Sequence, residues 1–314
     1  MEDYPKTLHE FEARFSTEKA CRDYLFQLRW PEGFVCPRCN NRKAWPIGNT
    51  LFHCTQCNYK LSVITGTIFQ DTHKPLTLWF RMIWWLTGQK NGASALGLKR
   101  ILGLGSYRTA WTWLHKLRRA MVRPGRENLS GIVEVDESYI GGEKSGKRGR
   151  GALGKALIFI AVETNENTIG RIRLQRIPDA SAVSLEGSVQ NTVTPGSVIQ
   201  TDKWKGYSNL QSLGYIHEIV RTDFDLGENL LPSCHLVASL LKRWLIGTHQ
   251  GAVSHEHLDY YLDEFTFRFN RRTSTHRGKL FYRLLQNAVQ IDPIPLKKII
   301  KNVRNHRRIK AHYI

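Results

Sequence analysis

Two cysteine motifs near the N-terminus constrain the fold of this chain more than any other feature. Cys36 and Cys39 form one C-x2-C motif, Cys54 and Cys57 form a second, and residues 40–53 separate them. This spacing is typical of a four-cysteine zinc site, in which two tight turns direct four thiolates at one ion. Because four ligands close a tetrahedral site, we expect the zinc to be structural. It would stabilise a small zinc ribbon, preceded by helices, within residues 1–70.

The charge of the chain indicates a polyanionic partner. Its 314 residues include 46 Lys and Arg against 27 Asp and Glu, which gives a formal net charge of +19. Such a surplus favours nucleic acid, because neutralising phosphates releases their counterions. The alternatives are a merely solvated basic surface and an affinity for anionic membranes.

The sequence lacks two patterns that accompany export and membrane insertion. The first residues do not show the charged stretch and apolar stretch of a signal peptide. No apolar run reaches the length of about 18 residues that is needed to span a bilayer. We therefore expect a cytoplasmic protein with no membrane partner, associated with the nucleoid when it is bound to DNA.

Residues 71–127 are predicted to form a helical connector. Apolar patterns predict helices at Leu76–Leu86, Ala93–Leu102 and Ser106–Met121, with a glycine turn before the third. A short helix, a glycine turn and a longer helix with polar leading residues form the layout of a helix-turn-helix, whose second helix reads the DNA major groove. The alternative is a plain helical hairpin that links two domains and uses Trp111, Trp113 and Leu117 as core residues.

Strand patterns dominate residues 128–285, and their order is informative. Runs at Gly131–Ile140, Ala156–Thr164 and Thr168–Ile177 precede a predicted helix at Ser181–Gln190 and a fourth run at Ser197–Thr201. Three strands, a helix, a fourth strand and further helices are the order of an α/β ribonuclease-H-like domain, in which helices flank a mixed sheet. We expect this fold for residues 128–285.

Asp136 and Asp202 are the candidate metal ligands of this domain. Asp136 lies in the first run, and Asp202 directly follows the fourth. The first and fourth strands are neighbours in such a sheet, so the two carboxylates are expected to meet. Adjacent carboxylates repel each other unless a cation lies between them, and hard divalent ions prefer oxygen ligands. We therefore predict two magnesium or manganese ions, suited to in-line phosphoryl displacement; the alternative is that each aspartate only caps a turn.

A third ligand is expected on a helix after the fourth strand. Pro232–Ile246 predicts that helix, with His235 near its start and Lys242 two turns later on the same face, where it would contact a DNA phosphate. Imidazole binds Mn²⁺ acceptably and Mg²⁺ less well, and it brings no negative charge. Glu264, followed seven residues later by Arg271, is the competing ligand; otherwise it is the polar side of an apolar helix.

Three further features are assigned from local pattern. Glu134 and Glu137 flank Asp136, and strand alternation places Glu137 on the opposite face of the sheet. The glycine-rich, basic Gly141–Gly151 would approach a phosphate backbone, or else be a solvated hairpin. Residues 286–314 form a basic C-terminal tail that would bind phosphates or stay disordered.

Five segments follow a known pattern: Val35–Asn40, Val133–Gly142, Thr201–Tyr207, Leu241–His249 and Glu264–Arg272. Together they resemble the bacterial insertion-sequence transposases that join a zinc ribbon to a ribonuclease-H-like, DDE-type (ISXO2-like) catalytic domain. The resemblance implies that Asp136 and Asp202 bind catalytic metal. It also implies that His235 with Lys242 stands where the family has its third ligand, which varies among Glu, Asn and His, and its trailing lysine.

The resemblance implies partners and an activity as well. It implies binding to the terminal inverted repeats of a mobile element and assembly of at least a dimer on two element ends. The expected protein is then a DNA transposase, a metal-dependent polynucleotidyl transferase of an Asp-Asp-His type. It would cut element ends with water and use the freed 3′-hydroxyl to attack target DNA. The alternatives are a zinc-ribbon and helix-turn-helix regulator with a lapsed catalytic site, and a non-specific ribonuclease-H-like nuclease.

Overall fold

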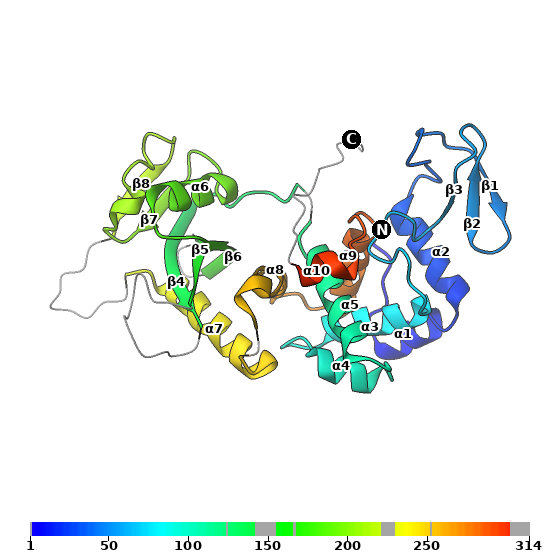
Figure 1. Ribbon diagram of the computed structural model, residues 1–314. Coiled ribbons are helices and arrows are strands. Elements are labelled where there is room, and N and C mark those ends of the chain that lie inside the picture. The colour runs from blue at the N-terminus through cyan, green and yellow to red at the C-terminus, as the bar shows by residue number, and fades with distance from the viewer. Residues whose placement is uncertain are drawn as a thin grey trace. The chain divides into compact units, whose positions relative to one another are not determined.

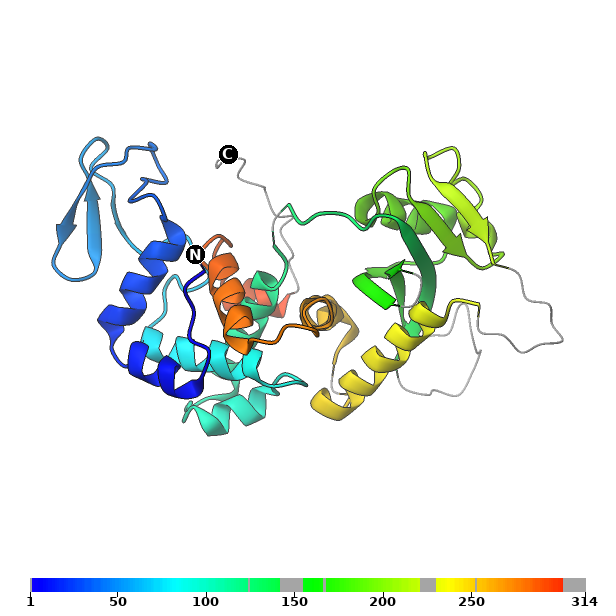
Figure 2. The ribbon, with the colours of Figure 1, turned by 180° about the vertical axis from the view of Figure 1, so that it is seen from behind.

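The computed structural model describes residues 2–123, 125–141, 155–165, 168–220, 230–251 and 253–301. The chain divides into two compact units (Figures 1 and 2). Unit 1 takes in the residues up to 124 together with those from 274 onward, and unit 2 comprises residues 125–273. In the described part of the chain, no helix is long and apolar enough to cross a membrane.

Unit 1 begins with two helices and a three-stranded ribbon. They are α1 (Leu8–Arg14), α2 (Glu18–Arg29), β1 (Ala44–Ile47), β2 (Leu51–Cys54) and β3 (Lys60–Ser62), and the strands lie in the order β1-β2-β3. Thr7 and Thr17 cap the helices, because each hydroxyl accepts a backbone N–H of the first turn. One face of the ribbon packs on α2 through Phe52, whose ring centroid lies 5.2 Å from that of Phe26. The segment between the two cysteine motifs therefore forms a β-hairpin, and α2 packs against it.

The rest of unit 1 is a helical core made from distant parts of the sequence. It consists of α3 (Leu76–Gly88), α4 (Ala95–Ile101), α5 (Tyr107–Ala120), α9 (Arg277–Ala288) and α10 (Leu296–Ile300). α9 packs against α3 and α5, and α10 packs against α5. Phe281 of α9 is fully buried, with its ring centroid 5.4 to 5.7 Å from those of Phe11, Phe15 and Phe80. Residues near the C-terminus thus complete the core of the N-terminal unit.

The helical connector, residues 71–127, combines features of a helix-turn-helix and of a plain helical hairpin with core residues. α4, a turn at Gly103–Gly105 and α5 follow one another as in a helix-turn-helix. Tyr107 and Arg108 at the start of α5 are exposed. Further along the helix, Trp113 stacks on Trp79 with 3.8 Å between ring centroids, and Arg118 is almost fully buried. The first turn of α5 is therefore its most exposed part.

Unit 2 is built around one mixed sheet. Its strands are β4 (Ile132–Ile140), β5 (Ala156–Asn165), β6 (Thr168–Ile177), β7 (Val198–Thr201) and β8 (Ile216–Ile219), in the order β6-β5-β4-β7-β8. β4, β5 and β6 pair antiparallel, whereas β7 pairs parallel with both β4 and β8. This order, with helices on both faces, is that of a ribonuclease-H-like domain, and it confirms the fold class that was expected.

Helices cover both faces of this sheet and produce three layers (Figure 1). The remaining elements are α6 (Ala182–Thr192), η1 (Lys205–Tyr207), α7 (Pro232–His249), η2 (His255–His257) and α8 (Leu258–Phe269). α6 and η1 share a core with Val133 and Val135 of β4, whereas α7 and α8 share the opposite core with Ile158 and Ile160 of β5. Side chains alternate between the faces of a strand. Asp136 therefore lies on the face that α7 and α8 cover.

The two compact units agree with only some of the domain boundaries expected at residues 70, 127 and 285. The change of unit at 124–125 lies close to the boundary at 127, but residues 274–285 belong to unit 1. The reason is that α9 buries its apolar side against α3 and α5. Residues 142–151 of the glycine-rich loop and 302–314 of the basic tail lie outside the described residues.

Candidate active site

The register of two parallel strands brings Asp136 and Asp202 to the same level of the sheet. β4 and β7 pair from Ile132 with Val198 to Glu134 with Gln200. Asp202 directly follows β7, and it lies as far from Asp136 in sequence as Val198 lies from Ile132. Extending the register by two residues therefore sets Asp202 opposite Asp136. Neighbouring strands thus create this pair, as the strand order predicts.

Asp136 is a largely buried carboxylate in a negatively charged setting. Its side chain is 19% exposed, and its Oδ1 accepts the backbone N–H of Glu137 at 2.8 Å. Burial raises the pKa of Asp136 to about 6, and the charges of Glu137 and Asp202 act in the same direction, although the Glu137 N–H and His235 oppose them. A bound cation would offset this cost, because it favours the ionised form.

His235 lies beside Asp136. It occupies the first turn of α7, where its Nε2 is 3.4 Å from Oδ2 of Asp136. The opposite side of α7 is buried on the sheet through an apolar set that includes Cys234, Val237 and Leu241. His235 and Lys242 fall on the exposed side of the same helix. The three groups expected at the site, together with the trailing lysine, are therefore carried by β4, the end of β7 and α7.

Glu264 has a different environment. It lies in α8 with no exposed side-chain surface, and its Oε1 accepts hydrogen bonds from Nε and Nη2 of Arg268, each at 2.9 Å. The trailing Arg271 donates to the carbonyl of Phe267 and lies over the ring of that residue. The bonds of Glu264 within α8 thus match those of a buried structural ion pair.

The segment after β7 holds Asp202 through a set of local contacts. Oδ1 of Asp202 accepts the backbone N–H of Trp204 at 3.0 Å, and the indole Nε1–H of Trp204 donates to the carbonyl of Ala180 at 2.9 Å. A Cβ at Gly206 would lie 2.7 Å from Trp204 Nε1 and from Leu185 Cδ1. Glycine is therefore the residue that fits at 206, and the spacing Asp-x-Trp-x-Gly is a requirement of packing.

Several residues around the aspartates were not singled out by sequence. The Tyr207 hydroxyl donates to Oε2 of Glu137 at 2.9 Å on the face opposite Asp136, where alternation places Glu137. Thr201 Oγ1 donates to the carbonyl of Asp202, and His217 Nε2 lies 2.8 Å from that hydroxyl. Gly206 and Tyr207, which follow β7, are the sequence features that could have pointed to the contact between Tyr207 and Glu137. The contact between Thr201 and His217 depends on β8, which no strong pattern indicates.

Glu134 is the other carboxylate that flanks Asp136, which sequence suggests as a residue that tunes the site. It is 6% exposed, and its Oε2 accepts the backbone N–H groups of Ser233 at 2.9 Å and Cys234 at 3.0 Å. A buried charge requires partners, so a glutamate inside an apolar strand was itself a signal. The partners, however, are about a hundred residues away in sequence.

The donor set of the site fits a hard divalent cation. Asp136 and Asp202 stand on neighbouring strands and His235 lies beside Asp136, and Mg²⁺ and Mn²⁺ both accept such oxygen-rich sets, Mn²⁺ with the greater tolerance for imidazole. Burial of Asp136 excludes part of the solvent and strengthens electrostatic interactions there. The cysteines outside the two motifs, Cys21 and Cys234, are fully buried thiols. Burial raises the pKa of Cys21 to about 12.

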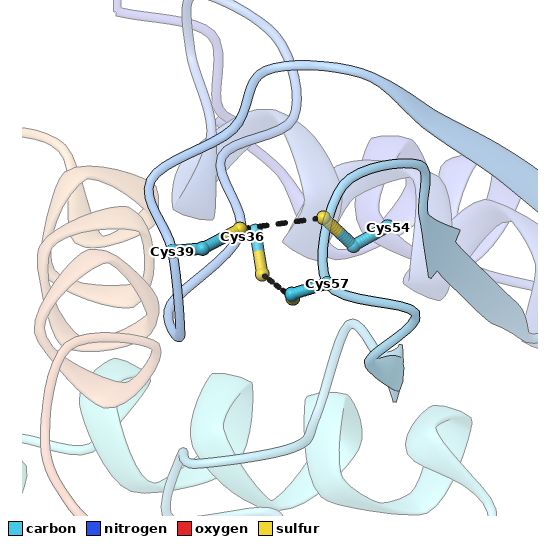
Figure 3. A group of neighbouring side chains, drawn as sticks. All are labelled: Cys36, Cys39, Cys54 and Cys57. Carbon is cyan, nitrogen blue, oxygen red and sulfur yellow. Dashed lines mark hydrogen bonds between the residues drawn. The ribbon is translucent and has the colours of Figure 1, made fainter.

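The four motif cysteines converge from two loops of unit 1 (Figure 3). Sγ atoms lie 3.6 Å apart for Cys36 and Cys57 and 3.5 Å apart for Cys39 and Cys54, and all four lie within 4.8 Å of one another. A tetrahedral zinc site with Zn–S bonds of about 2.3 Å needs sulfur atoms about 3.8 Å apart. These residues therefore fit a structural zinc ion.

Both cysteine loops share a backbone signature. The residue after the second cysteine is an asparagine in each, and Asn40 and Asn58 adopt positive φ values of 60° and 56°. Asparagine tolerates this left-handed conformation better than most residues. Each asparagine N–H donates to the carbonyl of the first cysteine in its own loop. The loops are thus two copies of one turn.

Comparisons with known proteins agree with this arrangement. Residues 128–270 match the model of the ISXO2-like transposase domain, and residues 16–60 match that of the transposase zinc-ribbon domain. The chain is 27% identical over 281 residues to an uncharacterized protein in transposable element ISH50 of Halobacterium salinarum, an alignment that covers 81% of this chain and 91% of that protein.

Solved structures with some likeness include the Mos1 strand transfer complex, at 13% identity and a TM-score of 0.25, and a pre-cleavage Mos1 transpososome, at 12% identity and a TM-score of 0.27. Each likeness spans 75% of this chain and 82% of the other. The two matched domains lie where the cysteine cluster and the paired aspartates were found. The chain therefore contains a transposase zinc-ribbon domain followed by an ISXO2-like transposase domain.

Proposed function

We propose that this protein is a DNA transposase that binds the terminal inverted repeats of an insertion sequence and catalyses both cleavage and strand transfer. The observation that supports the proposal is the pairing of the strands that carry Asp136 and Asp202 in a ribonuclease-H-like sheet, with His235 Nε2 3.4 Å from Asp136 Oδ2. The matches to two transposase domain models support the same activity.

Asp136, Asp202 and His235 are the residues that would hold magnesium or manganese. The chemistry that bound divalent ions supply is activation of an attacking oxygen and charge neutralisation at the leaving oxygen of an in-line displacement. The protein provides the two carboxylates on adjacent strands and an imidazole from α7. It also provides Lys242, whose exposed ammonium group has no ion-pair partner in the described part of the chain and is free to contact a DNA phosphate.

The proposed reaction has two displacements at phosphorus. In the first, water attacks a phosphodiester at the element end, the bond to the 3′-oxygen breaks, and a 3′-hydroxyl and a 5′-phosphate result. In the second, that 3′-hydroxyl attacks a target phosphodiester, a new ester forms, and the 3′-oxygen of the target leaves. No protein nucleophile takes part, which agrees with the inert, buried state of Cys234 near the site.

The net charge of +19 supports DNA as the partner, because phosphate neutralisation contributes most of non-specific affinity. Each element end requires its own active site, so a protein that joins two ends would act as a homo-oligomer. The four-cysteine ribbon would hold zinc as a structural ion.

The decisive experiment incubates the purified protein with labelled element ends and a target plasmid in Mn²⁺ or Mg²⁺. Cleaved ends and joined products are expected with the native protein, and neither is expected with Asp136→Asn or Asp202→Asn. Binding to the ends without any product would identify a regulator. Equal cutting of native and scrambled ends would identify a non-specific nuclease.

A further inference from the structure

Among the residues that the structure describes just before α7, none caps the start of the helix. Its N-cap residue, Leu231, makes no side-chain hydrogen bond, and Pro232 in the first position has no N–H. The next two N–H groups, of Ser233 and Cys234, both donate to Oε2 of Glu134. The N–H of His235 then begins the helical hydrogen bonds by donating to Leu231. Each N–H from Ser233 to His235 thus has an acceptor, and a residue of strand β4 supplies the cap.

Glu134 is suited to this contact by its charge and its burial. An ionised carboxylate that accepts two backbone N–H groups at a helix N-terminus gains from charge-assisted bonds and from the helix dipole. Without such partners a charge this deeply buried is strongly destabilising. The contact therefore fixes Glu134 and the first turn of α7 to each other.

The two residues joined by this contact are each next to a group of the candidate site. Glu134 lies two residues before Asp136 on the same face of β4, and Cys234 directly precedes His235 on α7. Glu134 and its hydrogen bonds to Ser233 and Cys234 therefore link the strand that carries Asp136 to the helical turn that carries His235. A shift of this contact would change the 3.4 Å separation between His235 Nε2 and Asp136 Oδ2.

Apolar packing alone does not fix this separation. Val237, Leu241 and Leu245 hold α7 against the sheet, but the hydrophobic effect is non-directional and resists sliding along the helix axis only weakly. Two N–H groups that converge on one oxygen define the axial position of the helix. We propose that Glu134 is a positioning residue that sets α7 so that His235 completes the metal site with Asp136. This inference rests on the proposed function, because it concerns the same metal site.

The test measures Mn²⁺ affinity by electron paramagnetic resonance on the full, zinc-loaded chain without DNA. Glu134→Ala is expected to weaken Mn²⁺ binding by about 10- to 100-fold, the range found when an outer partner of a metal ligand is removed. Glu134→Gln is expected to stay within a few-fold of the native protein, because one oxygen accepts both bonds and the amide carbonyl offers the same acceptor. Native affinity in Glu134→Ala would overturn the inference.

Glu134→Asp separates position from charge. Aspartate keeps the negative charge but withdraws its oxygens by one methylene, whereas glutamine keeps the reach and loses the charge. Positioning therefore predicts weaker Mn²⁺ binding in Glu134→Asp than in Glu134→Gln. The opposite order would mean that Glu134 acts through its charge on the metal site, and the inference would fail. This comparison stands even if Glu134→Ala does not fold.

A double-mutant cycle shows whether Glu134 acts through His235. In a His235→Ala background, Glu134→Ala is expected to cause no further loss of Mn²⁺ affinity, because the group that it positions is gone. Two additive losses would contradict the inference. Glu163→Ala is the matched control, since Glu163 is also a buried carboxylate of this sheet but accepts from Ser130 and Arg171. It is expected to lower stability and leave Mn²⁺ affinity unchanged.

The outcomes for this inference and for the proposed function are distinct. A native protein that binds Mn²⁺ but yields no cleaved or joined DNA would contradict the transposase proposal and leave the role of Glu134 intact. A native protein that transfers strands, with Mn²⁺ affinity indifferent to Glu134, would contradict only the positioning role.

Discussion

At the scale of single residues, the ionised form of Asp136 is costly in the metal-free protein. Its pKa rises from 3.8 to about 6, chiefly through burial. The stability contributed by the protonated form is fully present below pH 3.8 and is lost as the pH rises through about 6. Above that pH the carboxylate destabilises the fold by on the order of 3 kcal/mol.

Asp136→Asn is therefore expected to raise the melting temperature at pH 8 in buffer without added Mg²⁺ or Mn²⁺, and to give no gain at pH 4. Asp179→Asn is a control of opposite sign. Hydrogen bonds from Ser181 and Ser184 lower the pKa of Asp179, so its loss should reduce stability at pH 8. Calorimetry at both pH values measures each effect. An Asp136→Asn protein that melts no higher than the native one at pH 8 would contradict this account.

His235 and Glu264 are expected to respond to substitution in different ways. His235→Ala should abolish strand transfer, leave end binding intact and hardly alter the melting temperature, because the side chain is 54% exposed. Glu264→Ala removes a carboxylate from a buried ion pair with Arg268, so it should cost about 3–5 kcal/mol of stability and spare some activity. Strand-transfer assays beside denaturant unfolding measure both. Activity that survives His235→Ala but not Glu264→Ala would reverse the ligand assignment.

Single-residue reasoning could find the aspartates but not the residues that support them. Asp136 and Asp202 each interrupt or end an apolar strand, and strand order alone predicts that they are neighbours. The contact of Tyr207 with Glu137 joins positions far apart in sequence. No periodicity encodes such a pairing, because it depends on how η1 packs across the sheet.

At the scale of elements, the turn after β7 depends on one glycine. Gly206→Ala would push a methyl group against the Trp204 ring and Leu185, and overpacking of this kind costs about 1–3 kcal/mol. The ring would leave its bond to Ala180, and Asp202 would move with it. We expect a lower melting temperature and weaker Mn²⁺ binding.

Gly187→Ala is the matched control for this substitution. Gly187 lies inside α6 with open space where the methyl group of an alanine would lie, so alanine there should stabilise the helix by about 1 kcal/mol. Thermal unfolding and Mn²⁺ titration of both variants provide the comparison. If Gly206→Ala and Gly187→Ala changed the melting temperature and Mn²⁺ affinity equally, close packing around Gly206 would not be what holds Asp202 in place.

Element positions are predictable where a hydrophobic pattern is strong. The pattern predicts β6 at Thr168–Ile177, and the strand has those bounds; α7 begins at Pro232 as expected, because proline suits a first helical position. No pattern predicts β8, since Ile216–Ile219 is a short edge strand with two exposed isoleucines and no alternation toward a core. Alternation identifies a strand only where one face is buried.

At the scale of the whole molecule, the zinc ribbon is expected to depend on its metal while unit 2 does not. Structural zinc contributes on the order of 10 kcal/mol to modules of this size. Cys39→Ser or a strong chelator should therefore unfold residues 36–60 and leave residues 125–273 resistant to protease. Zinc content by mass spectrometry and limited proteolysis of the full chain measure this. Equal cleavage in both units would contradict the independence of the two cores.

The sequence does not predict which of the two units the last helices join. α9 is amphipathic, with Leu280, Phe281 and Leu284 buried on one side, so its existence is predictable. Its partners are not, because an apolar helix face is compatible with either unit. The fit of Phe281 among the rings of α1 and α3, together with the hydrogen bond from Asn287 to the carbonyl of Ala120, places α9 in unit 1.

This arrangement has a consequence for synthesis of the chain. The rings of Phe11, Phe15 and Phe80 leave the ribosome first, yet their core cannot close until Phe281 has been made. Unit 2 is continuous in sequence and can fold in the meantime, since domains generally fold as units during translation. A message broken off before α9 would thus release a finished sheet attached to an N-terminal region whose aromatic residues are still exposed. Such a fragment would be a substrate for chaperones or proteases and could not act as a shortened version of the protein.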